Sequence, residues 1–268
     1  SITDIGYLPA SERSDETVLI YPEDSADEEF VLSVGDSRQG WVKAYSKLIS
    51  LATDGDSEEA TVVIDLGNVR PAGEPLKGFG GVSNPVKLAD MFVKVSNVLN
   101  NAVGRKLTAL ECSLVIDEAA ACVVAGNIRR SAGMRQFACD DDEAINSKAG
   151  LYTQDADGNW KVDPTKEALR MANHTSCYHH KPSLEEVTSS VTKQFYSGEG
   201  AIQYVPEALF RANIDLLETD GERKKFLQIY NVDTELAIVE LIYISDKKGR
   251  RITEKEARHR ISRYGLNP

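Results

Sequence analysis

Residues 61–66, Thr-Val-Val-Ile-Asp-Leu, form a continuous apolar run in which β-branched side chains predominate. Such a run is typical of a strand that is buried on both faces, as in a parallel sheet. Strand-like and helix-like patterns alternate around it, with a strand pattern at 29–34 and helical patterns at 86–103 and 108–124. This alternation predicts an α/β fold with a substantially parallel sheet.

Further elements are expected toward both ends of the chain, beyond an acidic, weakly patterned lead-in over residues 1–30. Strands are expected at 17–21, 134–138 and 201–205, a turn at Asp157-Gly158, and helices behind Trp41 and at 140–148, 183–196, 206–212 and 253–263. The helix behind Trp41 should place Trp41, Val42, Tyr45, Leu48 and Ile49 on one face, with Asp36 or Ser37 as its cap. Residues 236–244 fit either a strand or a buried helix.

Composition narrows the classes of protein. The chain has 268 residues, 41% of them hydrophobic and 27% charged, which suits one large domain or two smaller ones. No stretch reaches the roughly 18 apolar residues that span a membrane, and no N-terminal basic-plus-apolar signal is present, so a soluble cytoplasmic protein is expected. The net charge of −11 lacks the basic face that a non-specific nucleic-acid binder needs.

The cysteines and histidines give no metal-binding spacing. Cys112, Cys122, Cys139 and Cys177 contain no CxxC pair, so neither zinc nor a disulfide framework is expected, and four buried or half-buried thiols are predicted. His174 follows Asn173 and precedes two small polar residues, and His179-His180 lies nearby. Because no acidic partner stands at metal-ligand spacing, a hydrogen-bonded structural histidine is the favoured interpretation.

Two glycine-rich loops are candidates for binding an anion. In residues 70–81 the glycines let backbone N–H groups approach closely, and Arg70 and Lys77 could neutralise phosphate. The spacing is neither that of a P-loop nor that of a Rossmann fingerprint, and a mobile surface loop explains it equally well. In residues 126–133, the adjacent Arg129 and Arg130 could contact a base edge or phosphate, or form a solvated basic turn.

Three segments resemble the adenosylcobalamin-dependent class of ribonucleotide reductase large subunits. Residues 70–81 resemble the first specificity loop, residues 126–132 the second, and Gly265-Leu-Asn-Pro268 the start of the active-site strand Asn-Pro-Cys-Gly-Glu. Order and spacing agree from about residue 30 onward. The resemblance implies that residues 1–268 form a central portion of a ten-stranded α/β barrel. It also implies reduction of the ribonucleotide 2′-hydroxyl by thiyl-radical chemistry, with adenosylcobalamin as cofactor.

The resemblance also implies roles for individual residues. Asp36 and Ser37 match the position that holds the effector nucleotide's sugar, and Lys77 one that meets effector phosphate. The segment between effector and substrate comprises Asn127, Ile128, Arg129 and Arg130. Gly73 and Asn267 match positions beside the substrate ribose. The implied partners are a ribonucleotide substrate, a dNTP or ATP effector, a thioredoxin-type reductant and companion segments of the barrel.

The chain departs from the family at its cysteines. The thiyl cysteine is expected directly after Pro268 and the general-base glutamate two residues beyond it, and none of the four cysteines lies in a matching motif. The chain alone is therefore expected to be inactive. Its ends would suit an intein insertion, a split gene or a boundary chosen by an experimenter. Two alternatives stay open: a non-catalytic nucleotide-binding module used for regulation or assembly, and a member of the iron-dependent class, although Asn267-Pro268 favours the cobalamin class.

Overall fold

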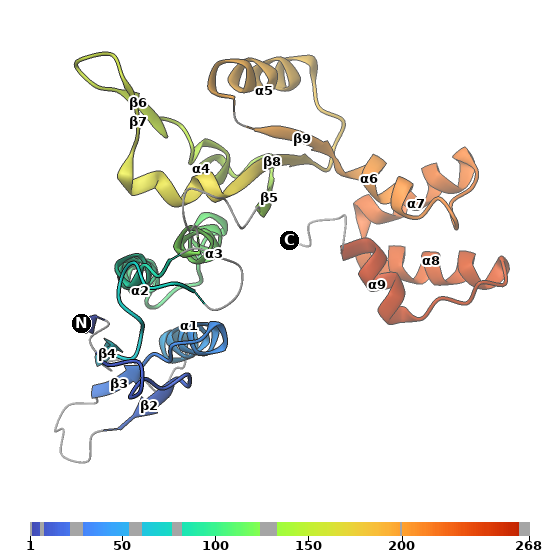
Figure 1. The fold of residues 1–268 in the computed structure, drawn as a ribbon. Helices are drawn as coiled ribbons and strands as arrows, with labels where there is room; N and C mark the ends of the chain where they lie inside the picture. Colours follow the sequence, from blue (N-terminus) through green and yellow to red (C-terminus); the bar gives the residue numbers. More distant parts are fainter. Residues whose placement is uncertain are drawn as a thin grey trace. The chain divides into compact units, whose positions relative to one another are not determined.

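The computed structural model describes residues 2–5, 8–21, 29–53, 61–76, 82–123, 133–198 and 200–262. The chain divides into two compact units. Figure 1 shows the fold, coloured along the sequence from blue at the N-terminus to red at the C-terminus. The first unit comprises Ser1–Gly133 with Thr165–Met171, and the second comprises Met134–Pro164 with Ala172–Pro268. Among the described residues, no helix is both long and apolar enough to cross a membrane.

The first unit contains a four-stranded sheet in the order β1-β4-β3-β2. Its strands are β1 (Ile2–Ile5), β2 (Val18–Ile20), β3 (Glu29–Ser33) and β4 (Thr61–Leu66). The central strand β4 pairs in parallel with β1 and β3, whereas β2 is an antiparallel edge strand. Val63 and Ile64 point to opposite faces of β4 and both are buried. The α/β class with parallel pairing, predicted from residues 61–66, is thereby confirmed.

Three helices accompany this sheet: α1 (Arg38–Thr53), α2 (Pro85–Asn101) and α3 (Ala109–Cys122). Each begins where the sequence provides a cap. Asn84 accepts from Lys87 N ahead of a proline at the first helical turn of α2. Thr108 and Glu111 form a reciprocal capping box at α3. Local sequence chemistry therefore sets the helix starts to within a residue or two of their expected positions.

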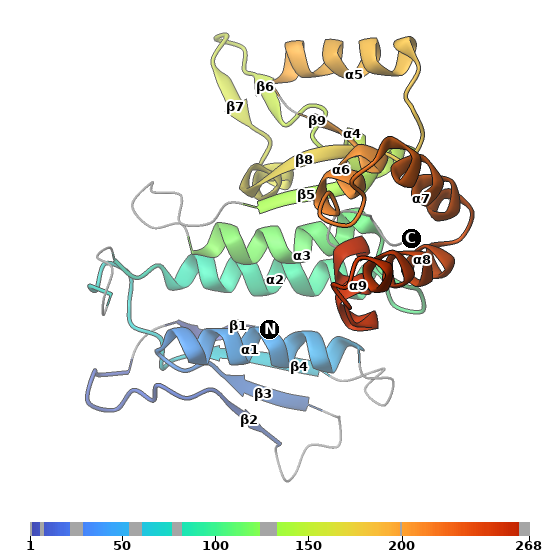
Figure 2. The same cartoon turned by 90° about the vertical axis from the view of Figure 1, so that its right-hand side faces the viewer.

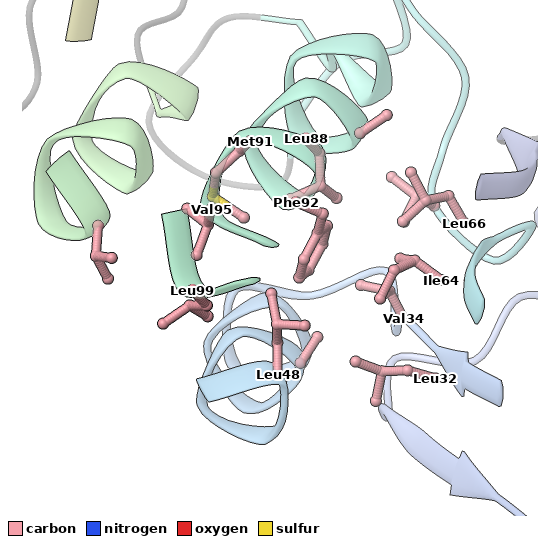
Figure 3. Close-up of a cluster of buried hydrophobic side chains, with 14 residues drawn as sticks. Leu32, Val34, Leu48, Ile64, Leu66, Leu88, Met91, Phe92, Val95 and Leu99 are labelled. Atoms are coloured by element: carbon pink, nitrogen blue, oxygen red, sulfur yellow. The ribbon is translucent and has the colours of Figure 1, made fainter. Parts of the chain in front are cut away.

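The core of the first unit lies between the sheet and helices α1 and α2. Figure 3 shows Phe92 reaching from α2 into the space between Leu48 of α1 and the strand residue Ile64. Phe92 is almost fully buried, and burying a phenylalanine side chain stabilises a fold by about 1.5–3 kcal/mol. One expected core position is wrong: Val42 is 65% exposed, because α1 turns Ala44 and Leu48 toward the core and Val42 away from it.

The second unit begins with a three-stranded sheet in the order β5-β8-β9. Its strands are β5 (Gly133–Ala138), β8 (Ala172–Tyr178) and β9 (Ala201–Tyr204), with β8 and β9 parallel. The segments between them include α4 (Asp142–Asn146), the hairpin β6 (Tyr152–Gln154) and β7 (Trp160–Val162), and α5 (Leu184–Ser197). The 3-10 helix η1 (Pro164–Met171) lies between β7 and β8 in the sequence, but from Thr165 onward it belongs to the first unit. The predicted turn at Asp157-Gly158 is confirmed, with Gly158 in the left-handed region at φ +82°.

Four further helices follow in the second unit, and Figure 2 shows them beside one another. They are α6 (Val205–Ala212), α7 (Asp220–Val232), α8 (Thr234–Lys247) and α9 (Glu254–Ser262). Residues 236–244, for which strand and helix were both open, are helical. The Asp233 side chain accepts from Glu235 N and Leu236 N and so starts α8, and the buried residues of α8 recur at helical spacing.

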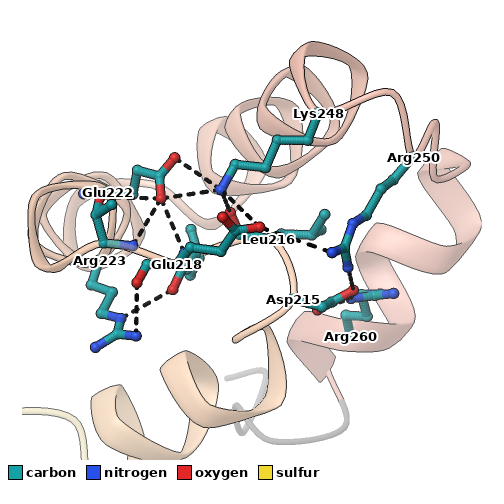
Figure 4. A network of polar contacts seen from close by, with 10 residues as sticks. Asp215, Leu216, Glu218, Glu222, Arg223, Lys248, Arg250 and Arg260 are labelled. Atoms are coloured by element: carbon teal, nitrogen blue, oxygen red, sulfur yellow. Dashed lines mark hydrogen bonds and ion pairs between the residues drawn. The ribbon is translucent and has the colours of Figure 1, made fainter.

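A polar network holds the connection between α6 and α7 against the two last helices (Figure 4). Lys248 Nζ donates to Leu216 O at 2.7 Å and lies 3.0 Å from Glu222. Arg260 and Arg250 both reach Asp215, at 2.8 and 3.1 Å. The network therefore fixes the irregular connection between α6 and α7 to helices α8 and α9, which pack against each other.

Candidate functional site

The sequence-predicted site residues that the structure describes are Asp36, Ser37 and Gly73. Asp36 and Ser37 follow the carboxyl end of β3, and Gly73 lies in the connection that follows β4. Since β3 and β4 are parallel neighbours, these connections leave the sheet at the same edge. Lys77, Asn127, Ile128, Arg129, Arg130 and Asn267 lie outside the described residues.

Ser37 is the residue that caps α1. Its Oγ accepts from Gly40 N at 2.9 Å, and its carbonyl accepts from Trp41 N at 3.0 Å. The same hydroxyl donates to Asp15 O at 2.7 Å. Of the two cap candidates, the structure therefore selects Ser37, and it ties the cap to an earlier segment of the chain.

Asp36 instead forms a buried ion pair with Arg70. Asp36 Oδ1 accepts from Arg70 Nε at 3.0 Å and from Arg70 N at 3.1 Å, and Oδ2 accepts from Nη2 at 2.9 Å. The hydrogen bond to this carboxylate raises the pKa of Arg70 above its ordinary value. A carboxylate has about four acceptor positions, and the described residues fill two on Oδ1 and one on Oδ2.

Hydrogen bonds hold the described parts of the connection after β4, residues 67–76 and 82–84. Arg70 Nη1 donates to Pro75 O at 2.7 Å, and Ser83 Oγ donates to Arg70 O at 2.9 Å. Gly73 N donates to Ser83 O at 3.1 Å, and Ser83 N to Glu74 O at 2.8 Å. Gly73 has φ +87° with open space at its Cβ position, so glycine serves the backbone conformation there.

Sequence reasoning missed the segment that encloses this site, residues 8–17. Arg13 Nη1 lies 2.8 Å from both carboxylate oxygens of Glu74, and its Nε donates to Leu8 O at 2.8 Å. Asp36 N donates to Ser14 O at 2.8 Å. No motif surrounds Arg13, and its partner is 61 positions away, so no local pattern could have found the contact.

His174, considered from the sequence, lies on β8 in the second unit and is 6% exposed. Its Nδ1 is 3.4 Å from Ser147 Oγ, and its ring meets Phe137 edge-on at 5.0 Å between centroids. Burial, helped by the charge of Lys148, lowers the pKa of His174 to about 4. The Ser147 contact agrees with the expected hydrogen bond of this histidine, and no partner for Nε2 is found among the described residues. In the described ranges no group of three or more His, Cys, Asp or Glu side chains could hold a metal ion.

In the part of the chain that the structure describes, burial raises the pKa of three of the four cysteine thiols. Burial raises the pKa of Cys122 to about 12 and that of Cys177 to about 11, and burial also raises the pKa of Cys139. The expectation of four buried or half-buried thiols is wrong for Cys112, which is exposed. Cys112 shares the outward face of α3 with Ile116, which is also exposed, one helical turn later.

Taken together, the described residues define a mixed α/β protein with a polar site at the carboxyl ends of two parallel strands. That edge is where open α/β sheets bind their ligands. Among the described residues, the site offers an acidic side chain that is not fully saturated with donors, a capped helix start and a glycine-containing loop held by arginines. These groups suit a polar ligand that both donates hydrogen bonds and carries negative charge.

Comparison with known proteins shows what parts of the chain are similar to. Residues 11–99, which include Asp36, Ser37 and Gly73, match the model of the B12-dependent ribonucleotide reductase insertion domain. The adenosylcobalamin-dependent ribonucleoside-triphosphate reductase of Levilactobacillus brevis is 39% identical over 116 residues, 42% of the chain. The enzyme of the same name from Lactobacillus leichmannii gives the same values. Over these stretches the chain is homologous to adenosylcobalamin-dependent ribonucleotide reductases, which confirms the resemblance inferred from the sequence.

The extent of the match is partial. The chain spans 16% of the length of the curated relatives named above. A crystal structure of a B-12 dependent (class II) ribonucleotide reductase is 29% identical, with a TM-score of 0.46, over 58% of the chain and 20% of that structure. The barrel implied by the resemblance and the roles of individual residues stay predictions.

Proposed function

We propose that the chain is a segment of an adenosylcobalamin-dependent ribonucleotide reductase and that it carries the effector-sensing loops and part of the substrate site. The match of residues 11–99 to the reductase insertion domain carries this proposal, because the Asp36–Arg70 assembly lies inside that range. The relatives are named for ribonucleoside triphosphates, so the proposed substrate is a ribonucleoside triphosphate. The whole enzyme would work in the cytoplasm and supply deoxyribonucleotides for DNA replication.

In this proposal two nucleotides meet in the enzyme at different places. Asp36, Ser37 and Lys77 contact the dNTP or ATP effector, and residues 127–130 lie between effector and substrate. Gly73 and Asn267 contact the substrate ribose. Asp36, Ser37 and Gly73 follow strands that end at the same sheet edge, which supports an effector site next to the substrate ribose. A loop whose conformation responds to both ligands would couple them, which is the physical content of allosteric selection.

The radical chemistry is proposed to lie outside the described residues. The whole reductase would use adenosylcobalamin, which supplies the radical that oxidises an active-site thiol. Cys122 and Cys177 pack among apolar side chains, and neither lies in a motif that matches the expected thiyl cysteine. Companion segments with the catalytic cysteines and a thioredoxin-type reductant would complete the enzyme. An intein or a split gene stays a prediction that reading the gene on both sides of the chain would test.

Reconstitution tests the proposal. The chain is co-expressed with the companion segments that carry the expected cysteines, and adenosylcobalamin-dependent reduction of ribonucleoside triphosphates is measured. We expect activity from the assembly and none from the chain alone. An assembly that forms but stays inactive would contradict the catalytic function, and retained dNTP binding would then favour the regulatory module. Changing Arg129 and Arg130 to alanine should blur the effector's control over substrate choice.

A further inference from the structure

Two arginines hold the loop at residues 70–76 from different sides. Arg70 belongs to the loop and reaches Asp36 and Pro75 O. Arg13 comes from the segment before β2 and binds both carboxylate oxygens of Glu74, each at 2.8 Å. The Arg13 side chain is 10% exposed and that of Glu74 is 34% exposed. This pair is therefore shielded more than an ordinary surface ion pair, and it is fixed further by the bond from Arg13 Nε to Leu8 O.

Glu74 occupies the position on which the shape of the loop depends. Its carbonyl accepts from Ser83 N, and the preceding residue, Gly73, donates to Ser83 O. Gly73 has a left-handed backbone conformation at φ +87°, which glycine adopts as readily as its alternatives. Gly73 alone therefore does not fix the conformation of the loop. The contact of Arg13 with the Glu74 carboxylate restricts the backbone movement that Gly73 would otherwise permit.

The segment that carries Arg13 is also fixed to the start of α1. Ser37 Oγ donates to Asp15 O, and Ser14 N donates to Asn68 Oδ1 at 3.1 Å. A Cβ atom at Gly35 would lie 2.4 Å from Asp15 O, so the close approach requires a glycine. Arg13 thereby links the helix start with Asp36 and Ser37 to the loop with Gly73.

We propose that Arg13 is a positioning residue, which holds Glu74 and so fixes the loop conformation on which nucleotide selection depends. The inference rests on the proposed function, in which the loop at residues 70–76 lies beside bound nucleotide, and it adds Arg13 and Glu74 to that site. Arg13 acts through Glu74 and touches no nucleotide itself. Its loss should loosen the loop while the sheet and α2 stay folded.

Amide hydrogen exchange on the full 268-residue chain tests the positioning role without any nucleotide. In Arg13→Ala, the amides of Gly73 and Ser83 should exchange at least about tenfold faster, as the loss of a charged hydrogen bond implies. Amides inside α2, such as Val95, should be unchanged. Arg211→Ala is the matched control, because among the described residues Arg211 pairs with Glu207 alone, in an exposed helical pair. Equal acceleration throughout the first unit, or none, would overturn the proposal.

Exchanging the two charges distinguishes the effect of the lost attraction from the effect of removing a side chain. Glu74→Gln should accelerate exchange at the same two amides. In the double variant with Arg13→Glu and Glu74→Arg, the attraction is restored with opposite polarity. Amide exchange at Gly73 and Ser83 should therefore be slower than with Arg13→Glu alone or Glu74→Arg alone. A double variant in which Gly73 and Ser83 exchange as fast as in Arg13→Ala would show that attraction between these side chains does not set the loop.

Nucleotide binding then tests the functional half. Dissociation constants for dATP, dGTP, dTTP and dCTP are measured by calorimetry on the wild-type chain and on Arg13→Ala. We expect the ratio between the strongest and weakest nucleotide to shrink by about tenfold, more than the mean affinity changes. A loosened loop with an unchanged ratio would overturn the role in selection. A wild-type chain that binds none of the four would contradict the proposed effector site itself, whatever the exchange data show.

Discussion

The two units of the chain use the same bidentate arginine–carboxylate chemistry in opposite surroundings. In the first unit, the side chains of Arg70 and Asp36 are 7% and 8% exposed. In the second, those of Arg258 and Glu235 are 46% and 66% exposed, although their contacts, 2.6 and 2.7 Å, are shorter. The length of the contacts therefore says little about which ion pair contributes more to stability. Burial decides, because a buried charge that loses its partner has no water to replace it.

The largest expected effect comes from breaking the buried pair. Arg70→Ala leaves the Asp36 carboxylate enclosed without its guanidinium and also removes the bond to Pro75 O. We expect the free energy of unfolding of the first unit to fall by about 3–5 kcal/mol, measured by urea denaturation. A paired change to apolar residues, Asp36→Leu with Arg70→Met, should recover part of that loss. A loss below about 1 kcal/mol, the range of exposed pairs, would contradict the claim that burial makes this ion pair more important for stability than the exposed one.

The second unit has its own buried ionisable group, His174, which is held neutral. Its pKa is lowered to about 4 from an ordinary 6.5, chiefly by burial. Between these values the unfolded chain takes up a proton that the folded chain does not, so stability is complete above about pH 6.5 and falls as the pH drops toward 4. The loss should reach up to about 3 kcal/mol at the acid end.

Urea midpoints at several pH values between these limits measure the effect of His174. His174→Asn should flatten the acid slope relative to the wild-type chain. Carboxylates such as Glu222, whose pKa is lowered to about 2 by hydrogen bonds from Thr219, contribute to both proteins and cancel in the comparison. Identical slopes would mean that His174 is solvated and does not share the enclosed character of Asp36 and Arg70.

A smaller effect tests what creates the burial in the first unit. In Gly35→Ala the new Cβ would lie 2.4–2.6 Å from backbone atoms of Asp15 and Glu16, which cannot rotate away as a side chain can. We expect a loss of about 1–3 kcal/mol, typical of overpacking, together with weaker protection of the segment at residues 8–17. Gly221→Ala in α7 is the matched control, since the nearest atom there is 4.0 Å away. Equal stability of the two variants would show that the segment's close packing does not enclose the site.

The same contrast separates what the sequence could predict from what it could not. Elements that depend on neighbouring residues were predicted: the helix that starts near Thr108, the cap of α1 at Asp36 or Ser37, the turn at Asp157-Gly158 and the buried strand at residues 61–66. Strand β8 was missed, because its histidine and small polar residues do not have the apolar pattern of a strand. Helix α7 was not anticipated either, since its buried residues, Phe226 and Tyr230, are few.

The site was predictable only in part, for a physical reason. Asp36, Ser37 and Gly73 could be singled out because motifs surround them in the sequence. Their partners could not, since Arg70 and Asp36 are 34 positions apart and Arg13 and Glu74 are 61 positions apart. Such pairs form only when the sheet brings distant connections to one edge. Sequence reasoning therefore singled out Asp36, Ser37 and Gly73 as candidate site residues, but it did not pair Asp36 with Arg70 or Glu74 with Arg13.

The smallest expected effect comes from the exposed pair and completes the contrast. Arg258→Ala removes contacts to both Glu235 and Glu254, yet these side chains are hydrated before and after the change. Exposed pairs gain little because solvent screens them and long side chains lose freedom when they pair. We expect a urea midpoint that cannot be separated from the wild-type value, and still less dependence on Arg258 at high salt. A loss as large as that of Arg70→Ala would mean that bond geometry outweighs burial in this protein.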